Sequence, residues 1–317
     1  MNARMRIGVI VAAFGALLAA TQCGGSSTRP TPPPPTTEPP PGTIPGPNPI
    51  PVPSAPQTFV GAGDIAWCST DGARLTAQLV QGIGGQVFTA GDNAYMDGSL
   101  QNYRDCYETT WGRFKDRTRP VAGNHEYDTD PSASGYYTYF GGFSGPPPGY
   151  YSYPVGDWHI IALNSALPNR GFEAGSAQLR WLEQDLIANK NKCTLAIWHH
   201  PLFTSGPNGP QNYTRDAWRL LYEHNVDVIV NGHDHLYEVF AAQDPDGRRD
   251  PARGIRQFTI GTGGAILYDV RTLAPNSERR ITNTWGVLKL TLGTGYDWEF
   301  IPVAGSSQRD SGHGECH

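Results

Sequence analysis

Polar clusters follow short apolar runs at five places along the chain, and this pattern constrains the fold more than any other feature. Each apolar run has the length of a buried strand and leads directly into Asp, Asn or His. Because ligand groups gather at the carboxyl ends of strands in an α/β sheet, the pattern predicts an α/β fold. The five clusters are Gly63-Asp64, Gly91-Asp92-Asn93-Ala94-Tyr95, Gly123-Asn124-His125-Glu126, His199-His200-Pro201 and Gly232-His233-Asp234-His235.

The remaining periodicity supports a mixed sheet sandwich flanked by helices. Apolar residues recur at helical spacing in Ala177 to Asn189 and in Arg215 to His224. Two segments, Tyr150 to Leu163 and Trp285 to Val303, have the pattern of antiparallel hairpins. Strands are expected at about 58–63, 86–90, 118–122, 158–163, 194–198, 226–231, 255–261 and 285–292.

The clusters contain the donor atoms of a metal site. Taken by itself, an Asp after a strand is as compatible with a turn or an N-cap as with a metal ligand. Repetition of the arrangement favours ligands, since Asp64 and Asp92 offer carboxylates and Asn124 offers a neutral oxygen to a hard cation. His233 and His235 are spaced to point the same way if their segment is extended.

The order Gly-Asp, Gly-Asp-x-x-Tyr, Gly-Asn-His-Glu, His-x-Pro, Gly-His-x-His resembles the calcineurin-like metallophosphoesterases. Tyr95 is similar to the tyrosine of the purple acid phosphatase branch, and the resemblance extends from Phe59 to about Val303. It implies a sandwich of two mixed β-sheets flanked by helices (α/β/β/α). The resemblance also implies, through the His-x-Pro spacing, that His199 rather than His200 is the metal ligand.

The resemblance also implies a dinuclear centre. One metal would be held by Asp64, Asp92, Tyr95 and His235, and the other by Asp92, Asn124, His199 and His233, with Asp92 bridging the two. In that branch the first ion is Fe3+ and the second is Fe2+, Zn2+ or Mn2+, which fits a first site of carboxylates and a phenolate. Zinc, manganese or mixed occupancy stays open.

The expected activity is metal-dependent hydrolysis of phosphoric esters by a metal-bound hydroxide, as in a phosphomonoesterase of the acid phosphatase kind. Asp92 and His125 are the expected catalytic residues, with His125 binding the phosphoryl group and protonating the departing oxygen; a supporting hydrogen-bonded role is the alternative. His200 either lines the substrate pocket or is structural. A phosphodiesterase or nucleotide hydrolase, and a tethered binding module without catalysis, are the alternative functions.

The N-terminal region has the pattern of an exported protein. Arg4 and Arg6 precede an apolar stretch, Ile7 to Ala20, so residues 1–23 are expected to be a signal peptide. Cys23 follows the apolar stretch and ends this segment, which is compatible with a bacterial lipoprotein anchor or with simple secretion. Residues 24–56 are rich in Pro and Thr and are expected to be a spacer or a disordered tail.

Four cysteines remain after Cys23, and three pairings are possible. The favoured pairs are Cys68 with Cys106 and Cys193 with Cys316, and free buried thiols are the alternative. The catalytic domain is expected at 57–305, with 306–317 as a C-terminal tail that the second disulfide would anchor. Disulfides agree with secretion or attachment to the cell envelope.

The charge of the chain limits its partners. A formal net charge of −5 with no Lys/Arg-rich run gives no attraction to a nucleic acid polymer. The expected partner is a small phosphate ester, and a lipid anchor would be the one membrane contact. The sequence does not indicate an oligomeric state.

Overall fold

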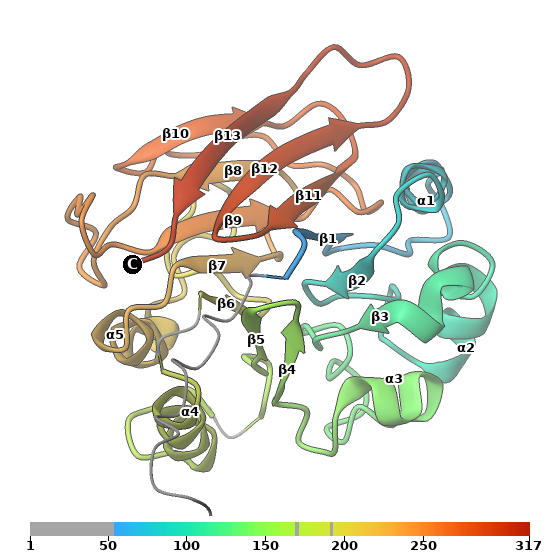
Figure 1. Cartoon of the computed structure of the whole chain (residues 1–317). Coiled ribbons are helices and arrows are strands. Elements are labelled where there is room, and N and C mark those ends of the chain that lie inside the picture. Colours follow the sequence, from blue (N-terminus) through green and yellow to red (C-terminus); the bar gives the residue numbers. More distant parts are fainter. Residues whose placement is uncertain (1–53, 169–170, 191–192) are drawn as a thin grey trace, which may run out of the picture. The chain divides into compact units, whose positions relative to one another are not determined.

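The computed structural model describes residues 54–168, 171–190 and 193–317. The expected signal peptide, the lipidation of Cys23 and residues 24–53 of the expected spacer lie outside the described residues. The described chain forms two mixed β-sheets that pack face to face, with helices on their outer faces (Figure 1). This arrangement confirms the predicted α/β/β/α sandwich.

The first sheet has six strands in the order β13-β12-β11-β1-β2-β3. Strands β1, β2 and β3 are parallel, whereas β11, β12 and β13 continue the sheet in antiparallel fashion on the other side of β1. The bounds are β1 Gln57–Ala62, β2 Gln86–Thr89, β3 Thr118–Arg119, β11 Gly286–Leu292, β12 Gly295–Pro302 and β13 Asp310–Glu315.

The second sheet has seven strands in the order β10-β8-β9-β7-β6-β5-β4. Its centre, β5-β6-β7-β9, is parallel, and its edges are antiparallel. The bounds are β4 Tyr151–Val155, β5 Trp158–Ala162, β6 Thr194–Ile197, β7 Val228–Asn231, β8 Tyr237–Phe240, β9 Arg256–Ile260 and β10 Ser277–Ile281.

The helices lie between strands along the chain. The α-helices are α1 Gly72–Gln81, α2 Leu100–Asn102, α3 Ser134–Phe140, α4 Ala177–Ala188 and α5 Arg215–Glu223. The other helical segments are the π-helical η1 Tyr103–Tyr107 and the 3₁₀-helical η2 Trp111–Arg117, η3 Gly141–Ser144 and η4 Asn212–Thr214.

Strand β6 shows how both faces of the central strands are buried. Leu195 and Ile197 belong to the core between the two sheets, whereas Ala196 faces the second core, where it meets Leu182 of α4 and Leu221 of α5. Because successive side chains of a strand point to opposite faces, a strand covered on both sides is a continuous apolar run. This explains why the sequence pattern identified the parallel strands.

Strand β13, which the sequence prediction missed, lacks such a pattern. Strand β13 contains no large apolar residue, yet it pairs with β12 along its whole length. Its Gly312 lies opposite Trp298, and a Cβ atom there would come within 2.2 Å of that ring. The glycines of β13 therefore leave the room that the aromatic side chains of β12 need. The expected tail at 306–317 is partly an edge strand of the first sheet. Strands β8 and β10 and helices α1 and α3 were also not anticipated.

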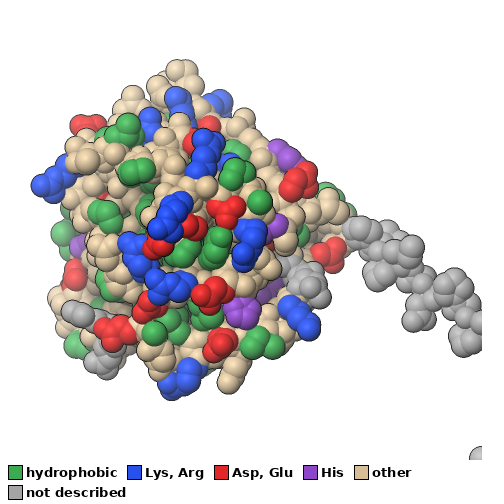
Figure 2. All heavy atoms as spheres, turned by 90° about the vertical axis from the view of Figure 1, so that its left-hand side faces the viewer, with side chains coloured by type: hydrophobic (Ala, Val, Ile, Leu, Met, Phe, Trp, Pro, Cys, Tyr) green, Lys and Arg blue, Asp and Glu red, His purple; other side chains and the backbone are tan. Residues whose placement is uncertain are grey.

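Two disulfides join distant segments, Cys68 to Cys106 and Cys193 to Cys316. The second connects the start of β6 to the residue that follows β13. Among the described helices, none has the length and apolar character needed to cross a bilayer. On the face that carries α4 and α5, basic and acidic side chains are interspersed rather than gathered by sign (Figure 2).

Candidate metal centre

The seven side chains expected as ligands come together at the carboxyl ends of the parallel strands of both sheets. Asp64 follows β1, Asp92 and Tyr95 follow β2, and Asn124 lies in the loop after β3. His199 follows β6, and His233 and His235 follow β7. Since the two sheets pack face to face, these strand ends meet at one edge of the sandwich.

Three of the side chains surround the hydroxyl of Tyr95 and form a group of four with it. Its oxygen lies 3.0 Å from Asp64 Oδ1, 3.2 Å from Asp92 Oδ2 and 3.1 Å from His235 Nε2. His235 Nε2 in turn lies 3.2 Å from Asp64 Oδ1. All four residues are at most 3% exposed. We call these residues the tyrosine group.

A second set surrounds Nε2 of His199, and we call it the histidine group. This nitrogen lies 3.1 Å from Asp92 Oδ2, 3.2 Å from Asn124 Oδ1 and 3.3 Å from His233 Nδ1. The same oxygen of Asp92 therefore contacts both groups. A single carboxylate oxygen between two donor sets is the geometry of a bridging ligand.

The donor atoms fit a pair of metal ions. Neighbouring ligand atoms of a six-coordinate ion, each about 2.1 Å from the metal, lie roughly 3 Å apart, as do the atoms here. Two carboxylates and a phenol with one imidazole suit a hard, acidic cation, while the carboxylate, amide and two imidazoles suit a divalent ion such as zinc or manganese. The chemistry of the residues thus agrees with the dinuclear centre that the sequence implied.

Three of these residues have a backbone conformation that side chains rarely adopt. The φ angles of Asp64, Asp92 and His233 are 57°, 49° and 73°. Strain of this kind persists only where the surroundings fix it, and it concentrates at functional sites. Close packing adds to the constraint, because a Cβ atom at Gly123 would lie 2.1 Å from Asp92 Oδ1.

The turn at His233 shows that the segment of His233 and His235 is not extended, contrary to the sequence prediction. His233 and His235 were expected to converge because alternate residues of an extended segment point the same way. The chain bends there instead, so His233 joins the histidine group and His235 joins the tyrosine group. Backbone contacts fix the other rings, since His199 Nδ1 lies 2.8 Å from the Ala90 carbonyl and His235 Nδ1 lies 2.6 Å from that of Ile266. Both rings therefore present Nε2 to the centre.

Glu126 supports the centre, and sequence reasoning gave it no role. Its buried carboxylate accepts hydrogen bonds from the backbone N–H groups of Asp92, Asn93 and Gly123 at 3.1, 2.8 and 2.6 Å. The Tyr103 hydroxyl donates a further bond at 2.9 Å. Glu126 thus joins the loop that carries Asp92 to the loop that carries Asn124. Its place in Gly-Asn-His-Glu was the one signal in the sequence.

Without a metal, protons compensate the carboxylates of the site. Burial by itself lowers the pKa of His199, but the charge of Asp92, the hydrogen bond to Asp92 and the charge of Asp64 together outweigh burial and raise this pKa to about 9. Burial and the positive charge of His199 lower the pKa of His233 to about 4. Burial and the charges of Asp64 and Asp92 raise the pKa of Tyr95 well above its usual value. A cation would replace the His199 proton and favour the phenolate of Tyr95.

Two further histidines border the centre. His125 has Nδ1 2.5 Å from the Met96 carbonyl and 2.9 Å from Asp128 Oδ2, and its Nε2 lies 3.9 Å from Asp92 Oδ2. His200 is 8% exposed, and its ring centroid lies 4.5 Å from that of His233. Burial lowers the pKa of His200 well below its usual value. Both residues are therefore close enough to contact a ligand of the metals.

A sandwich of two mixed sheets with this donor set at the strand ends defines a metallophosphoesterase. Residues 58–237 match the family described as calcineurin-like phosphoesterase, and the chain belongs to this family. The predicted resemblance to its purple acid phosphatase branch is confirmed.

Relatives named as purple acid phosphatases include proteins of Arabidopsis thaliana. The chain is 30% identical to purple acid phosphatase 21 of Arabidopsis thaliana over 66% of its own length and 50% of the relative's, and 27% identical to purple acid phosphatase 23 over 58% and 43%. It therefore spans half or less of the length of these relatives.

Solved structures share the fold. A purple acid phosphatase from yellow lupin seeds is 20% identical, with a TM-score of 0.66 over 82% of this chain and 54% of that chain. The Plasmodium protein GAP50, described as the anchor in the inner membrane complex, is 16% identical, with a TM-score of 0.65 over 83% and 90%.

Proposed function

We propose that the protein is a phosphomonoesterase that hydrolyses small phosphate esters with two metal ions. The observation that carries the proposal is the position of Asp92 Oδ2, which lies 3.2 Å from the tyrosine hydroxyl of one donor set and 3.1 Å from His199 Nε2 of the other. Asp64, Tyr95 and His235 would complete one site, and Asn124, His199 and His233 the other. When bound, two such ions activate water and neutralise charge on the phosphoryl oxygens.

His125 is suited to act on the substrate. Nδ1 is engaged by the Met96 carbonyl and by Asp128, so the ring is held with Nε2 toward the centre. This nitrogen would donate a hydrogen bond to a phosphoryl oxygen and pass its proton to the departing oxygen. Asp92 would hold both ions, and its Oδ1 also accepts the backbone N–H of His125 at 2.9 Å, which ties the two residues together.

The proposal includes export from the cytoplasm. Two disulfides join segments 38 and 123 residues apart, and such bonds persist in oxidising compartments. The apolar stretch Ile7 to Ala20 and the following Cys23 have the sequence pattern of an export signal with a possible lipid anchor. Mass spectrometry of the N-terminus of the mature protein tests this part, and an intact Met1 would contradict it.

The substrate class is tested with a monoester and a diester that share one leaving group. We expect kcat/KM for 4-nitrophenyl phosphate to exceed that for bis(4-nitrophenyl) phosphate by at least about tenfold, because a diester offers the two ions one anionic oxygen fewer. A preference for the diester would indicate a phosphodiesterase. Full metal occupancy without hydrolysis of either ester would indicate a tethered binding module.

The same assay tests the role of His125. In His125→Ala, hydrolysis of phenyl phosphate, which has a poor leaving group, should fall about a hundredfold, and by more than hydrolysis of 4-nitrophenyl phosphate. Equal losses on the two substrates would leave His125 a role in binding the phosphoryl group but none in proton transfer.

We further propose that the tyrosine group holds Fe3+ and the histidine group Fe2+, Zn2+ or Mn2+. A phenolate bound to ferric iron produces a visible charge-transfer band, so the purified protein should be coloured. The band should disappear in Tyr95→Phe while the fold is retained, since the ring still fits beside Trp67, whose centroid lies 4.9 Å away. Metal analysis combined with the visible spectrum checks this prediction, and an active, colourless wild-type enzyme would refute the iron assignment.

A further inference from the structure

A cavity of about 430 Å³ lies beside the histidine group. Asn124 lines it, and the Oδ1 atom of the same residue lies 3.2 Å from His199 Nε2, so the cavity adjoins the candidate metal centre. Its volume is in the range of small-molecule sites. Its lining consists of Asn124, Ser165, Ala166, Leu167, His200 and Tyr213.

Hydrogen bonds hold the His200 ring on one side. The Ser165 hydroxyl oxygen accepts the backbone N–H of His200 at 3.1 Å and lies 2.9 Å from His200 Nδ1. Ser165 therefore engages Nδ1 and leaves Nε2 as the ring nitrogen for a molecule in the cavity.

His200 Nε2 has no hydrogen-bond partner among the residues that the structure describes, and the residue as a whole is 8% exposed. Because the ring lines the cavity, Nε2 is available for a hydrogen bond to whatever occupies it.

The rest of the lining is uncharged. Ala166 and Leu167 contribute apolar surface, and the Tyr213 hydroxyl is already engaged, since it donates to the Ser165 carbonyl at 3.1 Å. The lining residues described include no Asp, Glu, Lys or Arg. An anionic group in this cavity would lose water without gaining an ion pair with these side chains, whereas an apolar ring would gain contacts.

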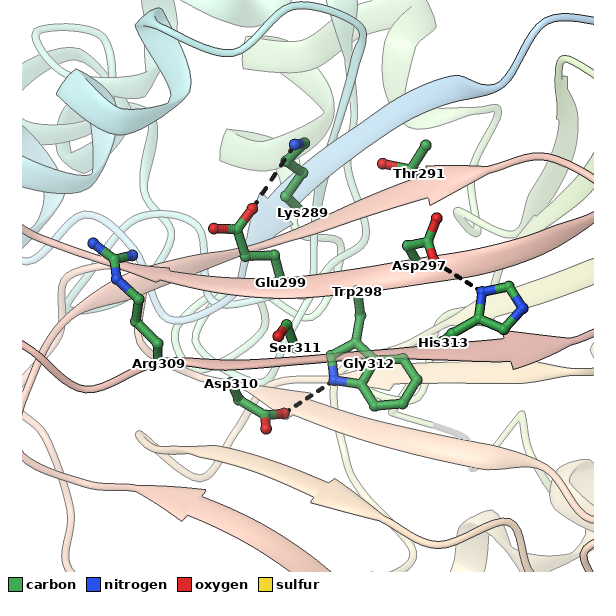
Figure 3. Close-up of a pocket in the computed structure, with 10 residues that line it drawn as sticks. All are labelled: Lys289, Thr291, Asp297, Trp298, Glu299, Arg309, Asp310, Ser311, Gly312 and His313. Carbon is green, nitrogen blue, oxygen red and sulfur yellow. Dashed lines mark hydrogen bonds and ion pairs between the residues drawn. The ribbon is translucent and has the colours of Figure 1, made fainter.

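A second hollow, on the face of β11, β12 and β13, differs in this respect. There Lys289 lies 3.8 Å from Glu299, His313 lies 2.8 Å from Asp297, and Trp298 Nε1 donates to Asp310 at 3.0 Å (Figure 3). These polar groups compensate one another and leave no buried donor for a ligand. The cavity at His200 is the better candidate for binding.

We propose that the cavity at His200 binds the alcohol portion of the substrate and selects an uncharged, ring-sized apolar group over one that carries a second negative charge. The inference rests on the proposed phosphomonoesterase function, because the phosphoryl group must occupy the metal centre. The Nε2–H group of His200 donates to the ester oxygen or to an acceptor on the ring.

The test uses two esters that differ in charge and little else, 4-ethylphenyl phosphate and 4-(carboxymethyl)phenyl phosphate. Wild-type enzyme should favour the first by at least about tenfold in kcat/KM, because the carboxylate would gain no ion pair with the described side chains that line the cavity. Leu167→Arg should reduce this ratio about tenfold or reverse it. Ile187→Arg is the matched control, since Ile187 is 55% exposed on α4 and lies outside the cavity lining, and it should leave the ratio unchanged.

His200 is tested separately from the metals. His200→Phe should lower kcat/KM for 4-ethylphenyl phosphate up to about tenfold at unchanged metal content, and His200→Gln, which restores an N–H donor, should recover part of it. If metal content falls with activity in both variants, the ring supports the histidine group and the donor role is wrong.

The outcomes separate the two proposals. Equal rates for the two esters, or a ratio that Leu167→Arg leaves unchanged, would overturn the inference about the cavity while the phosphomonoesterase stands. If neither ester is hydrolysed, the proposed function fails, and calorimetry with the corresponding arylphosphonates on metal-loaded protein still decides the selectivity. Equal affinities for the neutral and the anionic phosphonate would then refute it.

Discussion

Asp92→Asn is expected to lower kcat/KM by at least about a thousandfold and to reduce the metal content below two ions per chain. The physical reason is that one oxygen of Asp92 lies within 3.2 Å of both donor groups. An amide carries no negative charge and cannot offset two cations in a site that is 2% exposed. Metal analysis and the rate on 4-nitrophenyl phosphate measure the two effects.

The control for this prediction is Asp105→Asn. Asp105 is exposed, and its carboxylate accepts hydrogen bonds from the side-chain amide of Gln101, at 2.8 Å for each oxygen. This substitution should leave metal content and rate unchanged. If Asp92→Asn retained two metals and the wild-type rate, the assignment of Asp92 as the bridging ligand would be wrong.

Glu126→Gln should have the largest effect on stability. The carboxylate accepts three backbone N–H bonds and the Tyr103 hydroxyl, so an NH2 group in place of either oxygen would face a donor. We expect the free energy of unfolding to fall by about 3 kcal/mol, which is the upper end for hydrogen bonds to a charged group. Denaturant unfolding of the metal-free protein measures this change.

A second readout of Glu126→Gln concerns the metals. Glu126 ties the loop of Asp92 to that of Asn124, so the affinity for the ion of the histidine group should fall about tenfold to a hundredfold. Glu183→Gln, on the exposed face of α4, is the matched control and should alter neither quantity. Normal stability in Glu126→Gln would show that the network is not needed to hold the loops.

Long-range contacts of this kind also hold the strained backbone of the site. Asp64, Asp92 and His233 have positive φ angles, and each such residue costs on the order of 1–3 kcal/mol. Local sequence does not favour these conformations. Contacts from elsewhere in the chain, such as those of Glu126 with the Asp92 loop, hold them, which places the ligand atoms before a metal arrives.

The sequence alone determined the parts of the fold that depend on local pattern. Strands β1, β2, β6 and β7 are apolar on both faces, so they appear as short continuous runs, and the residues after them mark the carboxyl edge of the sheets. Helix α4 was predicted from its spacing to within one residue, because its buried face follows the helical period. The order of the motifs after these strands is also a feature of the sequence alone, and it identified the family.

Only the tertiary structure decided features that depend on residues far apart in the sequence. Strand β13 has no apolar pattern and forms because its glycines fit against the aromatic rings of β12. The role of Glu126 depends on N–H groups up to 34 residues away, and the hydrogen bond that engages His200 Nδ1 comes from Ser165, 35 residues earlier. Periodicity records which side of a strand or helix is buried, whereas these contacts arise when separate loops meet. The sequence therefore identified the candidate ligands, and the folded chain determined how Asp92 is shared between the two groups and what surrounds them.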